Sequence, residues 1–135
     1  MESNTLTNLA ALLGRAMLAA IFIIAGIDKI GAYAGTQAYM ESAGISGILL
    51  PAVIALEILG GIAILIGFQT RIAAALLAGF TLLAAVIFHS DFSQQIQMIL
   101  FMKNVAISGA FLMILSQGPG QWALRPQPRS REVRS

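Results

Sequence analysis

The sequence is poor in charged residues and contains no cysteine. Only 10% of its 135 residues are charged, whereas 58% are hydrophobic, and the mean hydropathy is +0.84. A soluble domain carries about 25% charged residues, so this composition leaves too little charge for a water-facing surface and argues against a soluble protein. The lack of cysteine, with a single histidine, argues against disulfides, thiol chemistry within the chain, structural zinc and iron–sulfur clusters.

Four long apolar stretches stand out instead, at residues 6–27, 48–68, 72–88 and 96–115. Each has about 17 to 22 residues, which is the length of helix that crosses a hydrocarbon layer of about 30 Å. Helices satisfy their own backbone hydrogen bonds in lipid, and short connections force antiparallel neighbours. The sequence therefore predicts an all-α, integral membrane four-helix bundle in up-and-down order, in contact with the lipid bilayer.

The parts outside the spans give the domain organisation. We expect an N-terminal segment at 1–8, a transmembrane domain at 9–117 and a tail at 118–135. The first connection, 28–47, is long enough for a short interfacial helix at about 36–43. The tail is rich in Pro, Arg and Ser without apolar periodicity, so we interpret it as disordered and close to anionic lipid.

Basic residues near the span ends indicate the orientation, because Lys and Arg resist translocation. One side holds five arginines and the other only Lys29. The arginines are Arg71, Arg125, Arg129, Arg131 and Arg134. We therefore expect both termini, and the basic tail, to be cytoplasmic. Four arginines beside Glu132 form too small a basic patch to indicate a nucleic-acid partner.

Ionisable side chains inside the predicted spans are the most informative residues. Glu57 is near the middle of the second span, Lys103 and Asn104 lie a third of the way along the fourth, and Arg15 a third along the first. Each charge at the bilayer centre costs about 2.5 to 3.5 kcal/mol. We therefore expect Arg15, Glu57 and Lys103 to meet one another, water or a ligand.

Two interpretations of this trio stay open. It is either a buried network that sets helix register without chemistry, or a site whose surplus positive charge holds an anionic or carbonyl-rich ligand. The single histidine, His89, lies at the end of the third span and is expected near Asp28 and Lys29. We interpret it either as a group that takes up and releases a proton or as an interfacial helix cap. No metal site is expected, because His89 with Asp91 and Asp28 has no recognisable ligand spacing.

An ordered series of short motifs resembles the DoxX family of small bacterial inner-membrane proteins. The series is Gly14-Arg15, IIAGIDK at 23–29, LEILGG at 56–61, GFQTR at 67–71, Phe88-His89, KNVAISG at 103–109 and GPG at 118–120. The resemblance implies a multi-pass protein of the bacterial inner membrane. The family's recurrent polar positions match Arg15, Lys29, Glu57, Arg71, His89, Lys103 and Asn104.

The resemblance also bears on function, because the family takes its name from a subunit linked to quinol oxidation and thiosulfate:quinone oxidoreduction. Some relatives join membrane complexes that manage oxidative stress. Our first hypothesis is a quinone-associated redox accessory subunit in which Lys103 and Asn104 contact one quinone oxygen, Arg15 or His89 the other, and Glu57 relays a proton. Without cysteine or another redox centre, the chain would need an electron-transferring partner protein.

Two alternatives come from other classes. The chain is a non-enzymatic scaffold, assembly or lipid-binding protein in which the charges fix helix packing, or it is a small proton-coupled carrier working through Glu57. Four helices form a pathway only as an oligomer, so the carrier requires a homo-oligomer. Whether the protein is an enzyme is left open by the sequence.

Overall fold

The computed structural model describes residues 2–125, in which every regular element is a helix. The elements are α1 (Glu2–Gly31), α2 (Tyr33–Ser42), the 3-10 helix η1 (Gly47–Leu49), α3 (Leu50–Ile66), α4 (Thr70–Phe88) and α5 (Gln95–Gln117). Four of them are long and apolar enough to cross a membrane, at Asn4–Gly31, Gly47–Ile66, Thr70–Phe88 and Gln95–Gln117. The all-α fold with four crossings is confirmed, and α2 is the short helix expected in the first connection.

Helix α1 is longer than its predicted span. Its 30 residues measure about 45 Å at 1.5 Å per residue, against a hydrocarbon thickness of about 30 Å. The N-terminal segment expected at 1–8 is helical from Glu2 onward. The helix also continues past the predicted end at residue 27, so Asp28 and Lys29 belong to its last turns.

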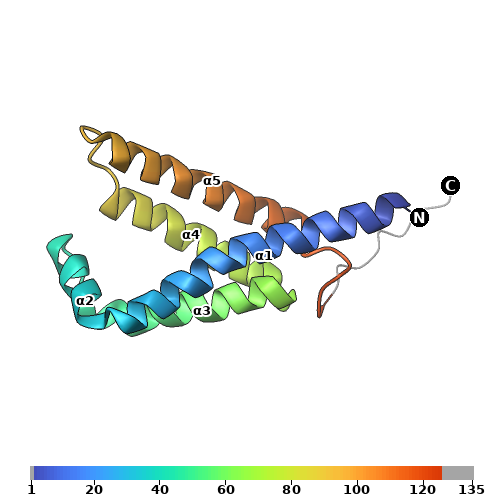
Figure 1. Cartoon of the computed structure of the whole chain (residues 1–135), viewed down its shortest axis with the longest axis horizontal. Helices are drawn as coiled ribbons and strands as arrows, with labels where there is room; N and C mark the ends of the chain where they lie inside the picture. The colour runs from blue at the N-terminus through green and yellow to red at the C-terminus, as the bar shows by residue number, and fades with distance from the viewer. Residues whose placement is uncertain (1, 126–135) are drawn as a thin grey trace.

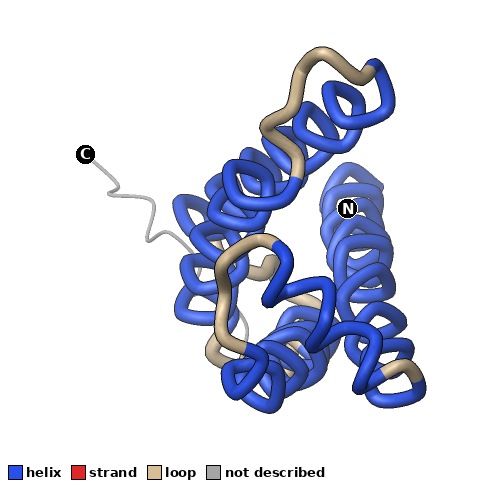
Figure 2. Tube along the Cα trace, turned by 90° about the vertical axis from the view of Figure 1, so that its left-hand side faces the viewer, coloured by secondary structure: helices blue, strands red, loops and turns tan. Residues whose placement is uncertain are grey.

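The four long helices associate as two pairs. Helix α1 packs along α3, and α4 packs along α5, while α3 and α4 make a smaller contact. The two pairs meet near the α3–α4 turn and diverge toward the end that carries α2 (Figure 1 and Figure 2). The start of α1 and the segment that follows α5 both lie at the opposite end (Figure 1). Their cytoplasmic location stays a prediction from the charge distribution.

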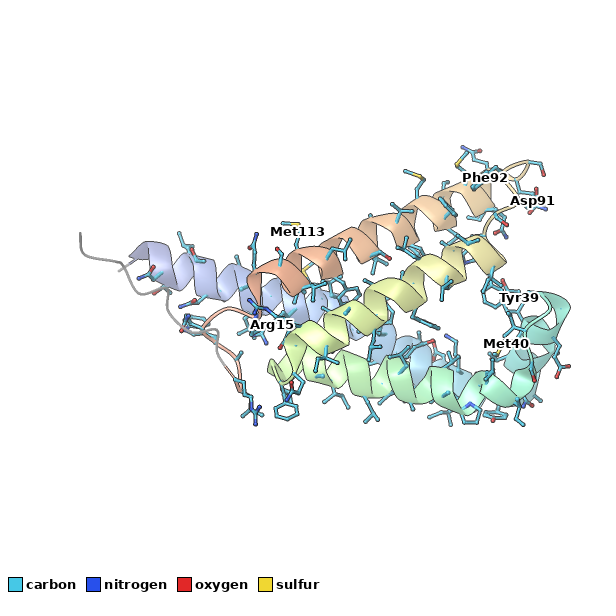
Figure 3. All side chains as sticks on the ribbon, turned by 180° about the vertical axis from the view of Figure 1, so that it is seen from behind. Arg15, Tyr39, Met40, Asp91, Phe92 and Met113 are labelled. Carbon is cyan, nitrogen blue, oxygen red and sulfur yellow. The ribbon has the colours of Figure 1, made fainter. Side chains whose placement is uncertain are left out.

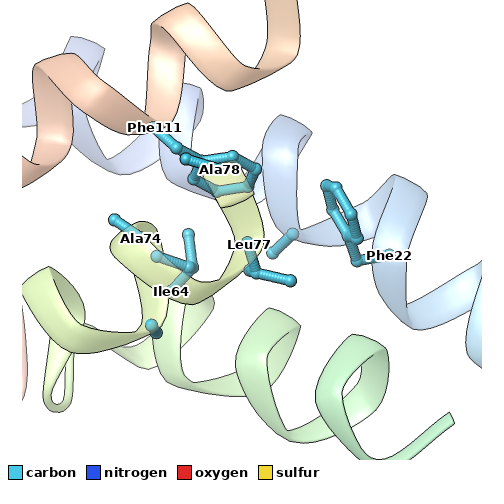
Figure 4. Packing of buried hydrophobic residues seen from close by; sticks show 8 residues of the cluster. Phe22, Ile64, Ala74, Leu77, Ala78 and Phe111 are labelled. Carbon is cyan, nitrogen blue, oxygen red and sulfur yellow. The ribbon is translucent and has the colours of Figure 1, made fainter. Parts of the chain in front are cut away.

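The buried core lies where the two pairs meet. Phe22 of α1 contacts Phe111 of α5 edge to face, with ring centroids 5.4 Å apart, and both rings pack with Ile64 and Leu77 (Figure 4). Outside this core the helices are apolar but exposed, since only 17 to 33% of each most apolar window is buried. Such a surface matches lipid, which supports contact with the bilayer.

Missing side chains let α1 approach α3 closely. A Cβ on Gly61 would lie 2.8 Å from Cγ1 of Ile23, and one on Gly26 would lie 2.5 Å from Cγ1 of Ile58. Real Cβ atoms do not come so near to other atoms, so both positions need glycine for this packing. The close approach at Gly26 brings the end of α1 against the middle of α3.

The start of the tail differs from its predicted disorder. The amides of Leu124 and Arg125 donate hydrogen bonds to the carbonyls of Ile66 and Gly67, at 2.8 and 3.1 Å. The Arg125 guanidinium also lies over the Phe68 ring, 5.0 Å from its centroid. Residues 118–125 are therefore ordered against the end of α3, and the disorder expected there is wrong. The remainder of the predicted tail, 126–135, lies outside the described residues.

Candidate functional site

A cavity of about 440 Å³ separates the two helix pairs at the end where they diverge. Most of its wall is apolar, and α2 covers it through Thr36, Tyr39 and Met40. Ligand pockets typically have volumes of about 300–1,000 Å³ and combine an apolar wall with a few polar groups. The polar groups of this wall include Lys29, Glu57, Thr81, His89, Lys103 and Asn104.

On the wall formed by α1 and α3, Lys29 forms an ion pair with Glu57. The Lys29 ammonium lies 2.9 Å from Oε1 and 3.2 Å from Oε2 of the carboxylate. The Glu57 side chain is 2% exposed and that of Lys29 is 29% exposed. Gly26 lies one turn before Lys29 on the same helix face, and its missing side chain gives Lys29 access to Glu57. Because α1 continues past residue 27, Lys29 takes the place that we had expected for Arg15.

Arg15 does not reach this cavity. It lies toward the other end of the bundle, away from Tyr39 and Met40 (Figure 3), because positions 15 and 29 are 14 residues, or about 21 Å, apart on α1. Its guanidinium donates hydrogen bonds to the carbonyls of Ile64 at 3.3 Å and Leu65 at 3.4 Å, and to that of Trp122. The expectation that Arg15 meets Glu57 is therefore wrong.

The carbonyls explain the position of Arg15. The last carbonyls of a helix lack intrahelical partners, and in lipid no water replaces them. Helix α3 ends at Ile66 and is capped by Gly67, which adopts the left-handed conformation with φ +75°. Arg15 supplies donors to carbonyls at this end and also holds the segment that follows α5. A Cβ on Gly67 would collide with the Arg15 guanidinium and with Ala123.

On the opposite wall, α4 and α5 present Thr81, Asn104 and Lys103. Nδ2 of Asn104 donates to the Thr81 carbonyl at 3.3 Å, and the two residues are 8% and 4% exposed. Among the described residues, the buried Thr81 hydroxyl has no hydrogen-bond partner. Lys103 is exposed and likewise has no ion-pair or hydrogen-bond partner within 2–125. This wall therefore carries donors that the fold leaves unused.

His89 and Asp28 were both expected at this end. His89 caps α4 and lines the cavity, and its Nδ1 lies 2.9 Å from Oε1 of Gln97 on α5. It lines the same cavity as Lys29. Asp28 is exposed and is not part of the wall. Thr81 and Gln97 were missed, since a single threonine inside an apolar helix or a glutamine near a helix end carries no signal of its own.

The closure of the cavity differs between its sides. Helix α1 packs along α3, whereas no comparable packing joins α1 to α5 within residues 2–125. Phe22, which contacts Phe111 of α5, lines the cavity. Ile21 and Leu83 line the cavity and are also 41% and 62% exposed. The cavity therefore communicates with the lipid-facing surface of the bundle.

The fold and site define the class of protein: a small four-span membrane protein whose helix pairs enclose an apolar cavity with ionisable groups. The DoxX family model matches residues 10–90. The chain is 49% identical over 119 residues to the inner membrane protein YqjF of Escherichia coli (strain K12), covering 88% of this chain and 92% of that protein.

A second relative gives the same result. The chain is 40% identical over 120 residues to the inner membrane protein YphA of the same organism, covering 84% of this chain and 86% of that protein. No solved structure matches the chain significantly. The protein belongs to the DoxX family, and it is an inner-membrane protein.

Proposed function

We propose that this protein binds a quinone in the cavity between its helix pairs and serves as an accessory subunit to a redox partner. The observation that supports this most is a cavity of about 440 Å³ with an apolar wall and polar groups on both sides. A quinone is soluble in lipid, and its ring carries two oxygens on opposite edges. An apolar wall suits the ring, and the polar groups suit the oxygens.

The unused donors fit such a ligand. A buried hydroxyl without a partner costs about 1 to 3 kcal/mol, and the Thr81 hydroxyl has none among the described residues. A cation in the hydrocarbon region also costs free energy unless it is paired or hydrated. A carbonyl oxygen between Thr81, Asn104 and Lys103 would reduce both costs. Because Arg15 does not reach the cavity, it is no longer proposed to contact the ligand. The residues proposed to contact the quinone oxygens are Lys103, Asn104, Thr81 and His89.

A bound quinone would supply the electron chemistry, and the chain's own residues would supply binding and orientation. The Lys29–Glu57 pair holds a carboxylate at the cavity wall, where it could accept a proton from a ligand hydroxyl. The partly exposed Lys29 ammonium would first release a proton to water and then take up the proton from Glu57. Since the chain has no cysteine, electrons would pass to a partner protein that carries its own redox centre.

The test is mass spectrometry of the molecules that stay with the protein after gentle extraction in native lipid. We expect a quinone enriched over its ratio to phospholipid in the surrounding membrane. Lys103→Met should lose this enrichment and Glu41→Gln, an exposed acid on α2 outside the cavity, should keep it. The folded yields are compared first, so that loss of the ligand is separated from loss of the protein.

Two outcomes would overturn the proposal. Phospholipid or fatty acid alone, retained in the same manner, would assign the cavity to lipid binding. No enriched molecule at all, with Lys103→Met also reducing folded yield, would make the polar groups structural and the protein a membrane scaffold.

A further inference from the structure

The two walls of the cavity differ in their hydrogen-bonding capacity. On the α1–α3 wall the Glu57 carboxylate only accepts, and two of its roughly four lone-pair positions remain after the two contacts from Lys29. On the α4–α5 wall Lys103 brings three unused donors and Thr81 one hydroxyl. A ligand that spans the cavity therefore meets the Glu57 acceptor beside the Lys29 ammonium on one side and unused donors on the other.

This asymmetry separates the two redox forms of one ring. A quinone oxygen only accepts hydrogen bonds, so beside the Glu57 carboxylate it would place acceptor against acceptor. A quinol hydroxyl donates to that carboxylate, and the second oxygen of the ring accepts from the opposite wall. We propose that the cavity prefers the reduced, quinol form, and that Glu57 is the residue that sets this preference. The inference rests on the proposed function and adds to it which form is bound.

The expected size of the preference follows from the contact that only the quinol makes. A hydrogen bond to a charged group contributes about 1.5–3 kcal/mol, and each 1.4 kcal/mol is tenfold in a dissociation constant. We expect the quinol to bind at least about tenfold more tightly than the quinone. For a two-electron couple, tenfold corresponds to a rise of about 30 mV in the potential of the bound pair.

The experiment measures the dissociation constants of decylubiquinol and decylubiquinone for the purified full chain by anaerobic titration calorimetry. Glu57→Gln should bring the two constants together, because an amide accepts weakly and also donates. Glu41→Gln, a matched change outside the cavity, should leave the ratio as in the wild type. Thermal unfolding of each variant confirms that the compared proteins are folded.

A second pair of variants tests the donor wall. Thr81→Val should weaken both forms about fivefold, the value of one neutral hydrogen bond of about 1 kcal/mol, and should leave their ratio unchanged. Thr70→Val is the matched control, because the Thr70 hydroxyl is also buried without a partner among the described residues but lies outside the cavity. It should change neither constant.

The outcomes distinguish the two proposals. Equal affinity of the wild type for both forms, or tighter binding of the quinone, would overturn the quinol preference and leave quinone binding in place. A tenfold preference that survives in folded Glu57→Gln would overturn the role of Glu57. Binding of neither form would overturn the proposed function itself. If Glu57→Gln fails to fold, the wild-type ratio alone decides.

Discussion

The two ends of the bundle differ in how far the hydrogen-bonding groups of their ionisable side chains are occupied. At the end of the bundle where α3 ends, Arg15 directs its donors to three backbone carbonyls, and only its Nε lacks a partner among the described residues. At the other end, Glu57 keeps free lone pairs after pairing with Lys29, and Lys103 has no partner in the described part of the chain. Both ends bear charge at membrane depth, and Glu57 and Lys103 line the cavity described above.

This difference in hydrogen bonding distinguishes charged side chains that stabilise the fold from charged side chains that can still contact a ligand. A cation whose donors are taken by helix carbonyls satisfies groups that lipid cannot satisfy, and it has little left for a ligand. An ion pair on a cavity wall keeps capacity for a further contact. The sequence grouped Arg15, Glu57 and Lys103 in one trio and left a structural and a functional interpretation open, whereas the hydrogen bonds assign Arg15 to packing and leave Glu57 and Lys103 on the cavity wall.

The largest expected effect is loss of the Arg15 contacts. Arg15→Leu should lower the free energy of unfolding by about 3 kcal/mol, because carbonyls at the end of α3 and in the 118–125 segment lose a charged donor. The measurement is thermal unfolding in detergent, with Arg71→Leu as the control. Arg71 is exposed, so its replacement should change stability by no more than about 0.5 kcal/mol. Equal effects of the two variants would contradict the structural assignment of Arg15.

The next effect concerns the close approach that forms the ion pair. Gly26→Leu should cost about 2 kcal/mol, since its side chain would overlap Ile58 and push α1 away from α3. Gly14→Leu is the matched control on the same helix, because a Cβ there has no atom within 4 Å among the described residues. Thermal unfolding compares the two. If Gly14→Leu destabilises as much as Gly26→Leu, the contact at Gly26 does not determine the helix spacing.

The sequence was sufficient to predict the membrane spans, but it was not sufficient to predict which side chains interact within them. Hydropathy and length located the four crossings, because lipid requires long apolar helices, and the length of the first connection indicated the short helix α2. The partner of Glu57 depends on where α1 ends, and α1 extends past the last apolar run of its span. Gly26 and Lys29 are three residues apart on one helix face. This spacing could have indicated that α1 approaches α3 closely there and that Lys29 is the partner of Glu57.

The ordered segment at 118–125 could not be predicted for a different reason. It is held by backbone hydrogen bonds to Ile66 and Gly67 and by the Arg15 contact with Trp122. Backbone contacts of this kind leave no pattern in side-chain hydropathy, so a segment rich in Pro and Gly reads as disordered whether or not it has them. Arg15 indicated a buried partner without indicating which one.

A smaller effect should come from the ion pair itself. A double-mutant cycle of Lys29→Met and Glu57→Gln should give a coupling of about 1 kcal/mol, at the low end for contacting residues because Lys29 is partly exposed and screened. Unfolding midpoints of the two single variants and the double variant supply the cycle. The pair of Arg15→Leu with Glu57→Gln is the control and should be additive, since the two residues do not meet. Coupling in that control would mean that Arg15 and Glu57 do interact, as the sequence analysis expected.

The smallest effect tests how firmly α2 covers the open end. Tyr39 stacks on Phe88 with ring centroids 5.1 Å apart and planes at 20°, and such a pair contributes about 0.5 to 1.5 kcal/mol. Because Tyr39 is 52% exposed, Tyr39→Leu should cost about 0.5 kcal/mol. It should speed hydrogen exchange in α2 several-fold while α3 and α5 keep the wild-type rates. Tyr33→Leu, at the start of the same helix and off the cavity wall, is the control for the loss of a ring. Faster exchange in α5 as well would mean that α2 supports both walls of the cavity and not only the α4 side that Phe88 belongs to.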